Sequence, residues 1–289
     1  MVERHSEQPW PLSAPESLVL LTGPETGDAV ALRAALLELV VRRSLRLTQV
    51  SDRRFFVFHP KVNVFSGGSL FTKRLEKPLQ RILDLYPQIP QKRYPDGVSG
   101  VPARRLAREF LRRHRPSYHS VLGRKTRVLN AESYVGGAIL PDLVKRGFYL
   151  CDAPAGGNPN EAITCSITEH GIETLSVLKD MLDEGRRSFA EWVTTDPKRA
   201  MDYVERAGPA ILLLPAQAPS IRKLHLQQQF ARIRPNRTSS PFGLIALAGI
   251  FGPGLEDGLD SASYTIAHEV DLAWESVLRS PMAGDRDGE

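Results

Sequence analysis

The chain has 289 residues, 42% of them hydrophobic, and a formal net charge of +5, which is ordinary for a packed protein of one large or two modest domains. Its longest apolar runs, 210–214 and 244–251, are too short to cross a bilayer, and residues 1–15 lack the apolar centre of a signal peptide. Two cysteines predict no disulfide framework. We therefore expect a cytoplasmic protein without an integral membrane segment.

The N-terminal part of the chain predicts a helix followed by a hairpin. Residues 1–16 are expected to form a flexible tail. An apolar segment at 17–21 and a turn rich in Gly and Pro lead into a strong helix from Asp28 to Arg43. Strand-like runs at 45–50 and 55–58 flank a polar turn, and this pattern predicts a β-hairpin.

A helix and a linker separate this hairpin from the next part of the chain. The helix is predicted at 77–86, and the Pro/Gly-rich stretch 87–102 is interpreted as the linker. We assign residues 17–98 to a first module. A second module, 99–187, is expected to begin with a basic helix.

The positive charge of the chain is concentrated between residues 104 and 127. This segment holds nine Lys or Arg residues and one Glu, a local charge of +8, so the rest of the chain is net negative. Such a cluster attracts the phosphates of nucleic acid or of lipid headgroups, although a run of charge is often only solvated surface. The candidate residues for binding an anionic partner are Arg104, Arg105, Arg108, Arg112, Arg113, Arg115, Arg124, Lys125 and Arg127.

The stretch 133–185 has the outline helix, hairpin, Thr-x-x-Gly, helix. Its first helix ends at Gly147, because glycine readily takes the left-handed conformation at a helix C-terminus. Short strands at 148–151 and 162–167 flank a tip of Gly, Pro and Asn residues. Thr168 is placed to cap the following helix, which has leucines at helical spacing.

This stretch resembles the winged helices of bacterial regulators, whose wing commonly precedes such a Thr-x-x-Gly. The final helix is expected to close at Gly185 and the Arg pair that follows it. A wing that touches DNA should carry basic residues, but the tip 152–161 holds two acidic residues and no Lys or Arg. The helix of the first module is so apolar that most of it must be buried. Sequence-specific DNA binding is therefore the second interpretation.

The chain also resembles the Golgi phosphoprotein 3 family, including its bacterial relatives. In residues 17–59 the resemblance rests on an acidic, Gly-containing turn and a helix with a Leu37-Glu38-Leu39 step and a basic end. In residues 133–150 it rests on a helix that ends in Lys145-Arg146-Gly147. The resemblance implies a largely helical, non-enzymatic fold that docks on anionic lipid headgroups.

The C-terminal part, 188–280, is expected to be a helical or α/β extension, with a charged tail at 281–289. One or two helices are predicted within residues 190–208. The apolar run 210–214 predicts a buried strand, and the pattern of 218–233 predicts an amphipathic helix.

Residues 234–244 resemble the Arg-rich Thr-Pro-Phe-Gly-Leu segment near the start of lantibiotic dehydratases. In that family the arginines and the Thr help to bind glutamyl-tRNA, and Arg237 and Thr238 are the best matches here. Asp271 and Trp274 resemble the Asp-aromatic step that follows. Too few residues remain for an intact dehydratase, so this resemblance implies an accessory or degenerate relative that acts in peptide modification.

No motif predicts catalysis. Cys151 and Cys165 flank the wing and could be cross-strand neighbours, but with His170 they lack the paired spacing of a closed zinc site. No nucleophile motif and no phosphate-binding loop is present. Neither catalytic residues, nor metal ligands, nor cofactors are therefore expected.

The interpretation that fits these patterns is a mainly α protein with small β-hairpins (α+β), built from two winged-helix-like modules and a C-terminal extension. Its expected function is non-catalytic binding or adaptor work, in which the basic segment 104–127 contacts an anionic partner. Another protein is the alternative kind of partner. A DNA-binding transcriptional regulator and an accessory protein of peptide modification are the alternative functions.

Overall fold

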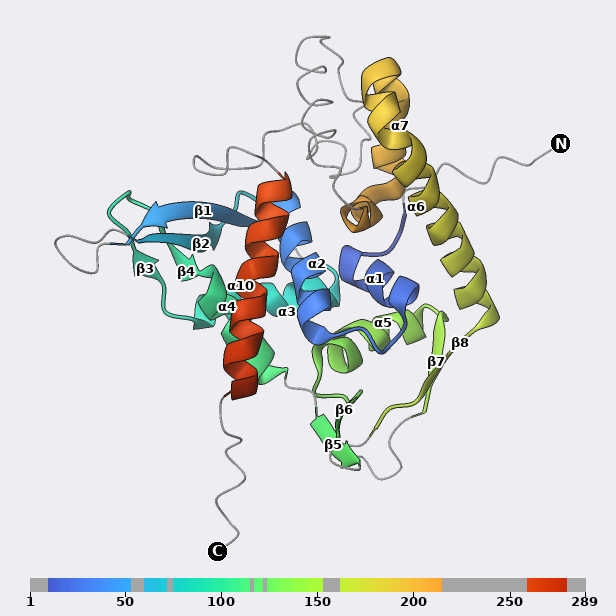
Figure 1. Cartoon of the computed structure of the whole chain (residues 1–289), viewed down its shortest axis with the longest axis horizontal. Helices are drawn as coiled ribbons and strands as arrows, with labels where there is room; N and C mark the ends of the chain where they lie inside the picture. Colours follow the sequence, from blue (N-terminus) through green and yellow to red (C-terminus); the bar gives the residue numbers. More distant parts are fainter. Residues whose placement is uncertain are drawn as a thin grey trace, which may run out of the picture.

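The structure is a computed structural model of the chain and describes residues 10–52, 60–71, 75–114, 117–121, 124–152, 162–214 and 259–279. These residues form a mainly helical protein with small antiparallel sheets, so the predicted α+β class is confirmed (Figure 1). Among the helices of the described ranges, none combines the length and the hydropathy needed to cross a membrane.

Helix α2 (Asp28–Val41) lies at the centre of the fold and is buried along nearly its whole length. Its Ala, Leu and Val residues surround the helix axis, as expected of a helix that packs on every side. Helices α1 (Ala14–Thr22), α3 (Lys77–Leu85) and α10 (Leu259–Arg279) all pack against it (Figure 1). The predicted helix from Asp28 to Arg43 is confirmed, and so is its burial, although it ends two residues earlier than expected.

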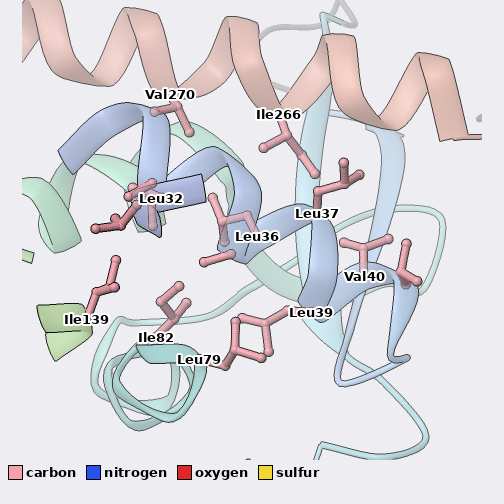
Figure 2. Packing of buried hydrophobic residues seen from close by; sticks show 14 of the residues in the cluster. Leu32, Leu36, Leu37, Leu39, Val40, Leu79, Ile82, Ile139, Ile266 and Val270 are labelled. Carbon is pink, nitrogen blue, oxygen red and sulfur yellow. The ribbon is translucent and has the colours of Figure 1, made fainter. Parts of the chain in front are cut away.

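Side chains from distant parts of the chain meet on α2. In Figure 2, Ile266 and Val270 of α10 point toward α2 from one side, and Leu79 and Ile82 of α3 approach from the other. All four side chains are almost completely buried. Because each such side chain contributes about 1.5–3 kcal/mol through its burial, this layer holds the N-terminal and C-terminal ends of the fold together.

Two carboxylates of α2 receive the N-termini of neighbouring helices. Asp28 Oδ1 accepts a hydrogen bond of 2.9 Å from the backbone N–H of Val135, at the start of the π-helical turn η2 (Val135–Ile139). Glu38 Oε2 accepts one of 2.6 Å from the N–H of Ala14, the first residue of α1. The first N–H groups of a helix lack partners within it and carry partial positive charge, so each carboxylate fixes where a neighbouring helix begins.

The sheet of the first half has the strand order β1-β2-β4-β3. Strands β1 (Leu45–Ser51) and β2 (Lys61–Gly67) form its long antiparallel pair, and β4 (Ser99–Pro102) pairs with both β2 and β3 (Lys92–Arg93). The first strand of the predicted hairpin is confirmed. The strand that returns along it is Lys61–Gly67, while the predicted 55–58 lie outside the described residues.

The prediction that residues 87–102 are a linker is wrong. This stretch contains the end of the 3₁₀ turn η1 (Tyr86–Gln88) and both short strands β3 and β4. Gly100 lies where a Cβ atom would approach Phe65 O to 2.3 Å, so the glycine allows β4 to lie close against β2. The Gly and Pro content that indicated a linker serves strand packing instead.

The basic helix and a second hairpin follow the sheet. Helix α4 (Ala103–Arg113) starts directly after β4, and β5 (Ser117–Val121) pairs with β6 (Arg124–Val128) in an antiparallel hairpin. Figure 1 shows this hairpin at the lower end of the molecule, beneath α5. The predicted basic helix is therefore present, and it directly follows β4.

The second helix, hairpin, helix sequence is present as predicted. Turn η2 continues into α5 (Leu140–Lys145), strands β7 (Tyr149–Cys151) and β8 (Cys165–Ile167) pair, and α6 (Glu169–Thr195) follows. Two local signals explain why. Gly147 has a φ of 78° after the end of α5, and the Thr168 side chain caps α6 by accepting the Gly171 N–H at 3.0 Å.

Helix α6 does not close at Gly185 but continues for ten more residues. Gly185 faces α7 (Pro197–Ala207), and a Cβ there would lie 2.1 Å from the Tyr203 hydroxyl. The glycine therefore permits close helix packing and does not end the helix.

The predicted strand at 210–214 is also wrong, because the 3₁₀ helix η3 (Gly208–Leu213) occupies these residues. The predicted helix 218–233 lies outside the described residues.

The predicted tail 1–16 contains the start of the fold. Ser13 caps α1 with a reciprocal capping box, in which the Ser13 N–H donates to Glu16 Oε2 at 2.8 Å. Trp10 Nε1 donates to Ser17 Oγ at 2.7 Å, and the Trp10 N–H donates to the carbonyl of Arg206 at 2.8 Å. The capping box was the sequence signal for this helix, and residues 10–16 belong to the packed structure.

The expectation drawn from two cysteines is also corrected. Cys151 of β7 and Cys165 of β8 are directly opposite in the ladder and form a disulfide. The prediction that they are cross-strand neighbours is confirmed. The number of cysteines alone did not predict this disulfide, which forms because the two cysteines are opposite each other in the ladder.

Glu38 should make the stability of the fold depend on pH. Its side chain is completely buried, and burial raises the pKa of its carboxyl to about 7, against the opposing effect of Arg42, whose Nη2 lies 2.6 Å from Glu38 Oε1. Folded protein therefore binds the proton more tightly than unfolded protein, and the free energy of unfolding falls as the pH rises from about 4.5 to about 7.

We predict that Glu38→Gln removes this trend. Over that pH range the free energy of unfolding of the variant should gain roughly 3 kcal/mol relative to the wild type. Urea denaturation at a series of pH values measures the difference, and Glu173→Gln on the exposed face of α6 controls for the loss of one negative charge. Parallel pH profiles for Glu38→Gln and wild type would contradict the prediction.

Candidate anion-binding surface

Helix α4 separates an apolar face from a basic one. Leu106, Ala107, Phe110 and Leu111 are buried, at the spacing of one helix face. Apart from Ala103, which is also buried, and Glu109, the remaining positions are arginines. Two of them, at the end of the helix, also complement the partial negative charge of its C-terminus. The amphipathic pattern thus explains both why this segment is helical and why its charge lies on the outside.

Three arginines define the candidate site, and we call them the arginine row: Arg105, Arg108 and Arg112. Successive residues of a helix are 100° apart, which places all three opposite the buried face of α4. The Arg112 side chain is 62% exposed, and its Nη1 lies 3.8 Å from Glu109 Oε1, a contact too long to hold the side chain firmly. Arg108 Nε is buried and has no hydrogen-bond partner among the described residues.

Arg104, in contrast, is exposed but pairs with a carboxylate of another helix. Its Nε lies 3.2 Å from Glu269 Oε2 on α10. Glu269 Oε1 also accepts a hydrogen bond of 2.9 Å from Asn63 Nδ2 on β2. A second pair, Arg33 of α2 with Asp271 of α10, attaches the same helix. Arg104 therefore helps to fix α10, and among the described residues it is the arginine of α4 that pairs with a carboxylate on another element.

Arg113 lies at the other side of α4. Its Nη1 donates to the side-chain oxygen of Gln88 at 2.7 Å, so its positive charge is oriented but not neutralised by this contact. The neighbouring His114 ring packs against Phe110, with ring centroids 4.5 Å apart. Burial and the charges of Arg81 and Arg113 lower the pKa of His114 to about 4, so the ring is neutral at pH 7 and adds no charge of its own.

The remaining candidates follow α4 along the chain. Arg124, Lys125 and Arg127 lie in β6, where they pair with Val121, Ser120 and Tyr118 of β5. These three residues are placed by the backbone register of the hairpin. Arg115 lies outside the described residues. The hairpin leaves the end of α4 after a short connection, so the two basic elements are neighbours.

Other residues singled out in the sequence do not join this surface. Arg237 and Thr238 lie outside the described residues, so the proposed tRNA motif stays a prediction. His170 stacks on Phe148 with ring centroids 5.0 Å apart, and both cysteines are in the disulfide. Within the described ranges, no group of three or more His, Cys, Asp or Glu residues could hold a metal ion.

Sequence reasoning missed the helix that covers part of the basic segment. Helix α10 buries a stripe of small and β-branched side chains against the fold, and this stripe at helical spacing was the available signal. Its members are Ala262, Ile266, Val270, Ala273 and Val277. No local sequence pattern indicates that the acidic residues beside the stripe meet Arg104 and Arg33.

The comparisons with known proteins found no relative. No family model matches the chain, and neither a curated protein nor a solved structure matches it. The resemblances to winged helices, to the Golgi phosphoprotein 3 family and to lantibiotic dehydratases therefore stay predictions. The geometry of α4 and the hairpin is what supports a binding surface.

A double-mutant cycle can test whether Arg104, unlike the arginine row, pairs with α10. We predict that Arg104→Ala and Glu269→Ala are coupled by about 0.5–1 kcal/mol in the free energy of unfolding, because the half-exposed pair is partly screened by water. The control cycle of Arg105→Ala with Glu269→Ala should give no coupling. Equal coupling in both cycles would mean that Arg104 has no special tie to α10.

Proposed function

We propose that this protein is a non-catalytic binding or adaptor protein whose basic surface contacts a phosphate-bearing partner. The observation that carries the proposal is the arginine row, which faces away from the core of α4 and meets no carboxylate closer than the 3.8 Å contact with Glu109 among the described residues. Arginine suits this role because its planar guanidinium binds phosphate through two hydrogen bonds at once. The hairpin β5–β6, which follows α4 in the chain, carries three more basic residues in its sequence: Arg124, Lys125 and Arg127.

The proposal includes the winged-helix-like interpretation of both helix-and-hairpin units. In a winged helix that reads DNA, an exposed helix enters the major groove. Here α2 is buried, and in the second unit Val135, Ile139 and Leu143 are almost completely covered. These helices offer little free surface for base contacts. Their burial supports a structural role for both units and favours contact through α4 and the hairpin over sequence-specific reading of DNA.

The acidic helix α10 supports the same assignment. Its carboxylates pair with Arg104 and Arg33, and the arginine row is left without such partners. If α4 were basic only for internal pairing, carboxylates of comparable proximity would be expected beside Arg105 and Arg108. No such ion pair occurs within the described residues. The charge that remains is therefore available to an outside ligand.

The proposal predicts a specific loss of anion binding in Arg105→Gln/Arg108→Gln/Arg112→Gln. On nucleic acid, the slope of log affinity against log salt should become shallower by about two to three units, because each arginine that contacts phosphate releases about one counterion. Binding is measured by salt titration on random duplex DNA, on single-stranded RNA and on liposomes containing anionic lipid. The melting temperature should stay close to that of the wild type, because none of the three arginines is among the buried residues of α4 and the stem of Gln keeps part of the packing of the half-buried Arg105 and Arg108.

The matched control removes the same charge elsewhere. Lys179, Arg186 and Arg187 lie exposed on α6, and their joint replacement by Gln should leave binding to the preferred partner nearly unchanged. Binding by liposomes alone would identify a lipid-docking adaptor, and binding by DNA or RNA would identify a nucleic-acid partner. Equal losses in the two triple variants, or no binding to any of the three probes, would overturn the proposal.

A further inference from the structure

The hairpin β7–β8 is held at two separate places, and we call them the root and the outer end. At the root, the Thr168 N–H donates to Phe148 O at 3.0 Å and its hydroxyl donates to Gly147 O at 2.5 Å. Gly171 allows this closeness, because a Cβ there would lie 2.3 Å from Phe148 O. The root therefore has its own hydrogen bonds and packing, independent of the disulfide.

The outer end has much less support. The ladder contains only three residue pairs, and the Cys151–Cys165 pair is the last of them. Beyond it, two backbone hydrogen bonds are found among the described residues, from the Asp152 N–H to Thr164 O at 3.0 Å and from the Ile163 N–H to Leu129 O at 2.8 Å. Leu150, between the root and the disulfide, is 67% exposed and adds little burial. An isolated two-stranded hairpin is marginally stable in water, so the covalent bond adds substantially to these two hydrogen bonds in keeping the outer end closed.

We propose that the Cys151–Cys165 disulfide is a reversible redox site, which a dithiol reductant opens to release the outer end of β7–β8 while the root stays closed. Both cysteines are only partly buried, so an attacking thiolate can reach the bond.

The exchange is balanced by the reductant itself. One thiolate of the dithiol attacks one cysteine sulfur, breaks the S–S bond and releases the other cysteine as a thiolate. The second thiol of the reductant, as its thiolate, then displaces the first cysteine from the mixed disulfide. The two protons of the dithiol pass to the two cysteine thiolates. The protein gains two electrons and two protons, and the dithiol becomes a disulfide.

Opening the outer end also affects the basic hairpin β5–β6. The Ile163 N–H, two residues before β8, donates to the carbonyl of Leu129 at 2.8 Å, and Leu129 directly follows β6. Release of β8 removes a tie at the base of β5–β6. Reduction should therefore weaken binding of an anionic partner through this hairpin, a consequence that rests on the proposed function.

The first experiment uses the full chain purified without reductant. Alkylation followed by intact mass measurement should find no free thiol before, and two thiols after, treatment with dithiothreitol under native conditions. Hydrogen exchange then compares two pairs of amides. Those of Asp152 and Ile163 report on the outer end and should exchange faster after reduction, on the order of a hundredfold. Those of Thr168 and Gly171 report on the root and should not change.

The variant Cys151→Ser/Cys165→Ser is the control. Without treatment it should show the fast exchange of the reduced protein, and dithiothreitol should not alter it. The proposal is overturned if the untreated protein already carries free thiols, if the bond is reduced only after denaturation, or if reduction leaves the Asp152 and Ile163 amides protected. Reoxidation must restore their slow exchange, and failure to do so would show that the site is not reversible.

Anion binding gives a separate readout. The oxidised and reduced proteins are compared on whichever probe the wild type binds, with the double serine variant alongside. Weaker binding in both the reduced protein and the variant supports the link to the basic hairpin, and equal binding overturns that link. If no anionic probe binds at all, the proposed function fails, while alkylation and hydrogen exchange still decide the redox proposal.

Discussion

The fold depends on the burial of helix α2. A helix covered on nearly every side needs partners in all directions, and α1, α3 and α10 supply them from distant parts of the chain. Burial also raises the free-energy cost of any charge that the helix carries. Asp28 and Glu38 are tolerated because each receives the N-terminus of a neighbouring helix, and Arg42 balances Glu38. By accepting these hydrogen bonds, the two buried carboxylates fix where α1 and η2 begin.

This arrangement decides which charges are left for function. Helix α2 and the helix formed by η2 and α5 are buried by packing and are not free to bind a partner. Helix α10 places carboxylates beside Arg104 and Arg33. The surface of α4 that remains is basic because the arginine row lies opposite the buried apolar face of the helix. A charged segment thereby divides into a part that stabilises the fold and a part that faces outward. Its total charge of +8 therefore overstates what a ligand would meet.

Much of the local structure was predictable because its signals are local. Gly147 and Thr168 mark helix boundaries through their own conformation and hydrogen bonds, and the apolar run of α2 requires burial whatever surrounds it. The errors arose where the cause is non-local. Gly100 was interpreted as part of a linker and Gly185 as the end of a helix. Each glycine is instead required by the close approach of a strand or a side chain from elsewhere in the chain. The same holds for the site, because the arginines of α4 could be named but the pairing of Arg104 with Glu269 could not.

The disulfide illustrates why position outweighs number. Two cysteines cannot form a framework of several disulfides. One cross-link is enough to hold this hairpin closed, because the ladder has three residue pairs and 13 residues lie between the two cysteines. Cys151 and Cys165 are directly opposite because Gly147 and Thr168 fix the root and thereby the register of the ladder. The local signals that define the helix boundaries also bring the two sulfurs together. The bond is then a consequence of how the chain turns, and it closes the part of the hairpin that those signals alone leave weak.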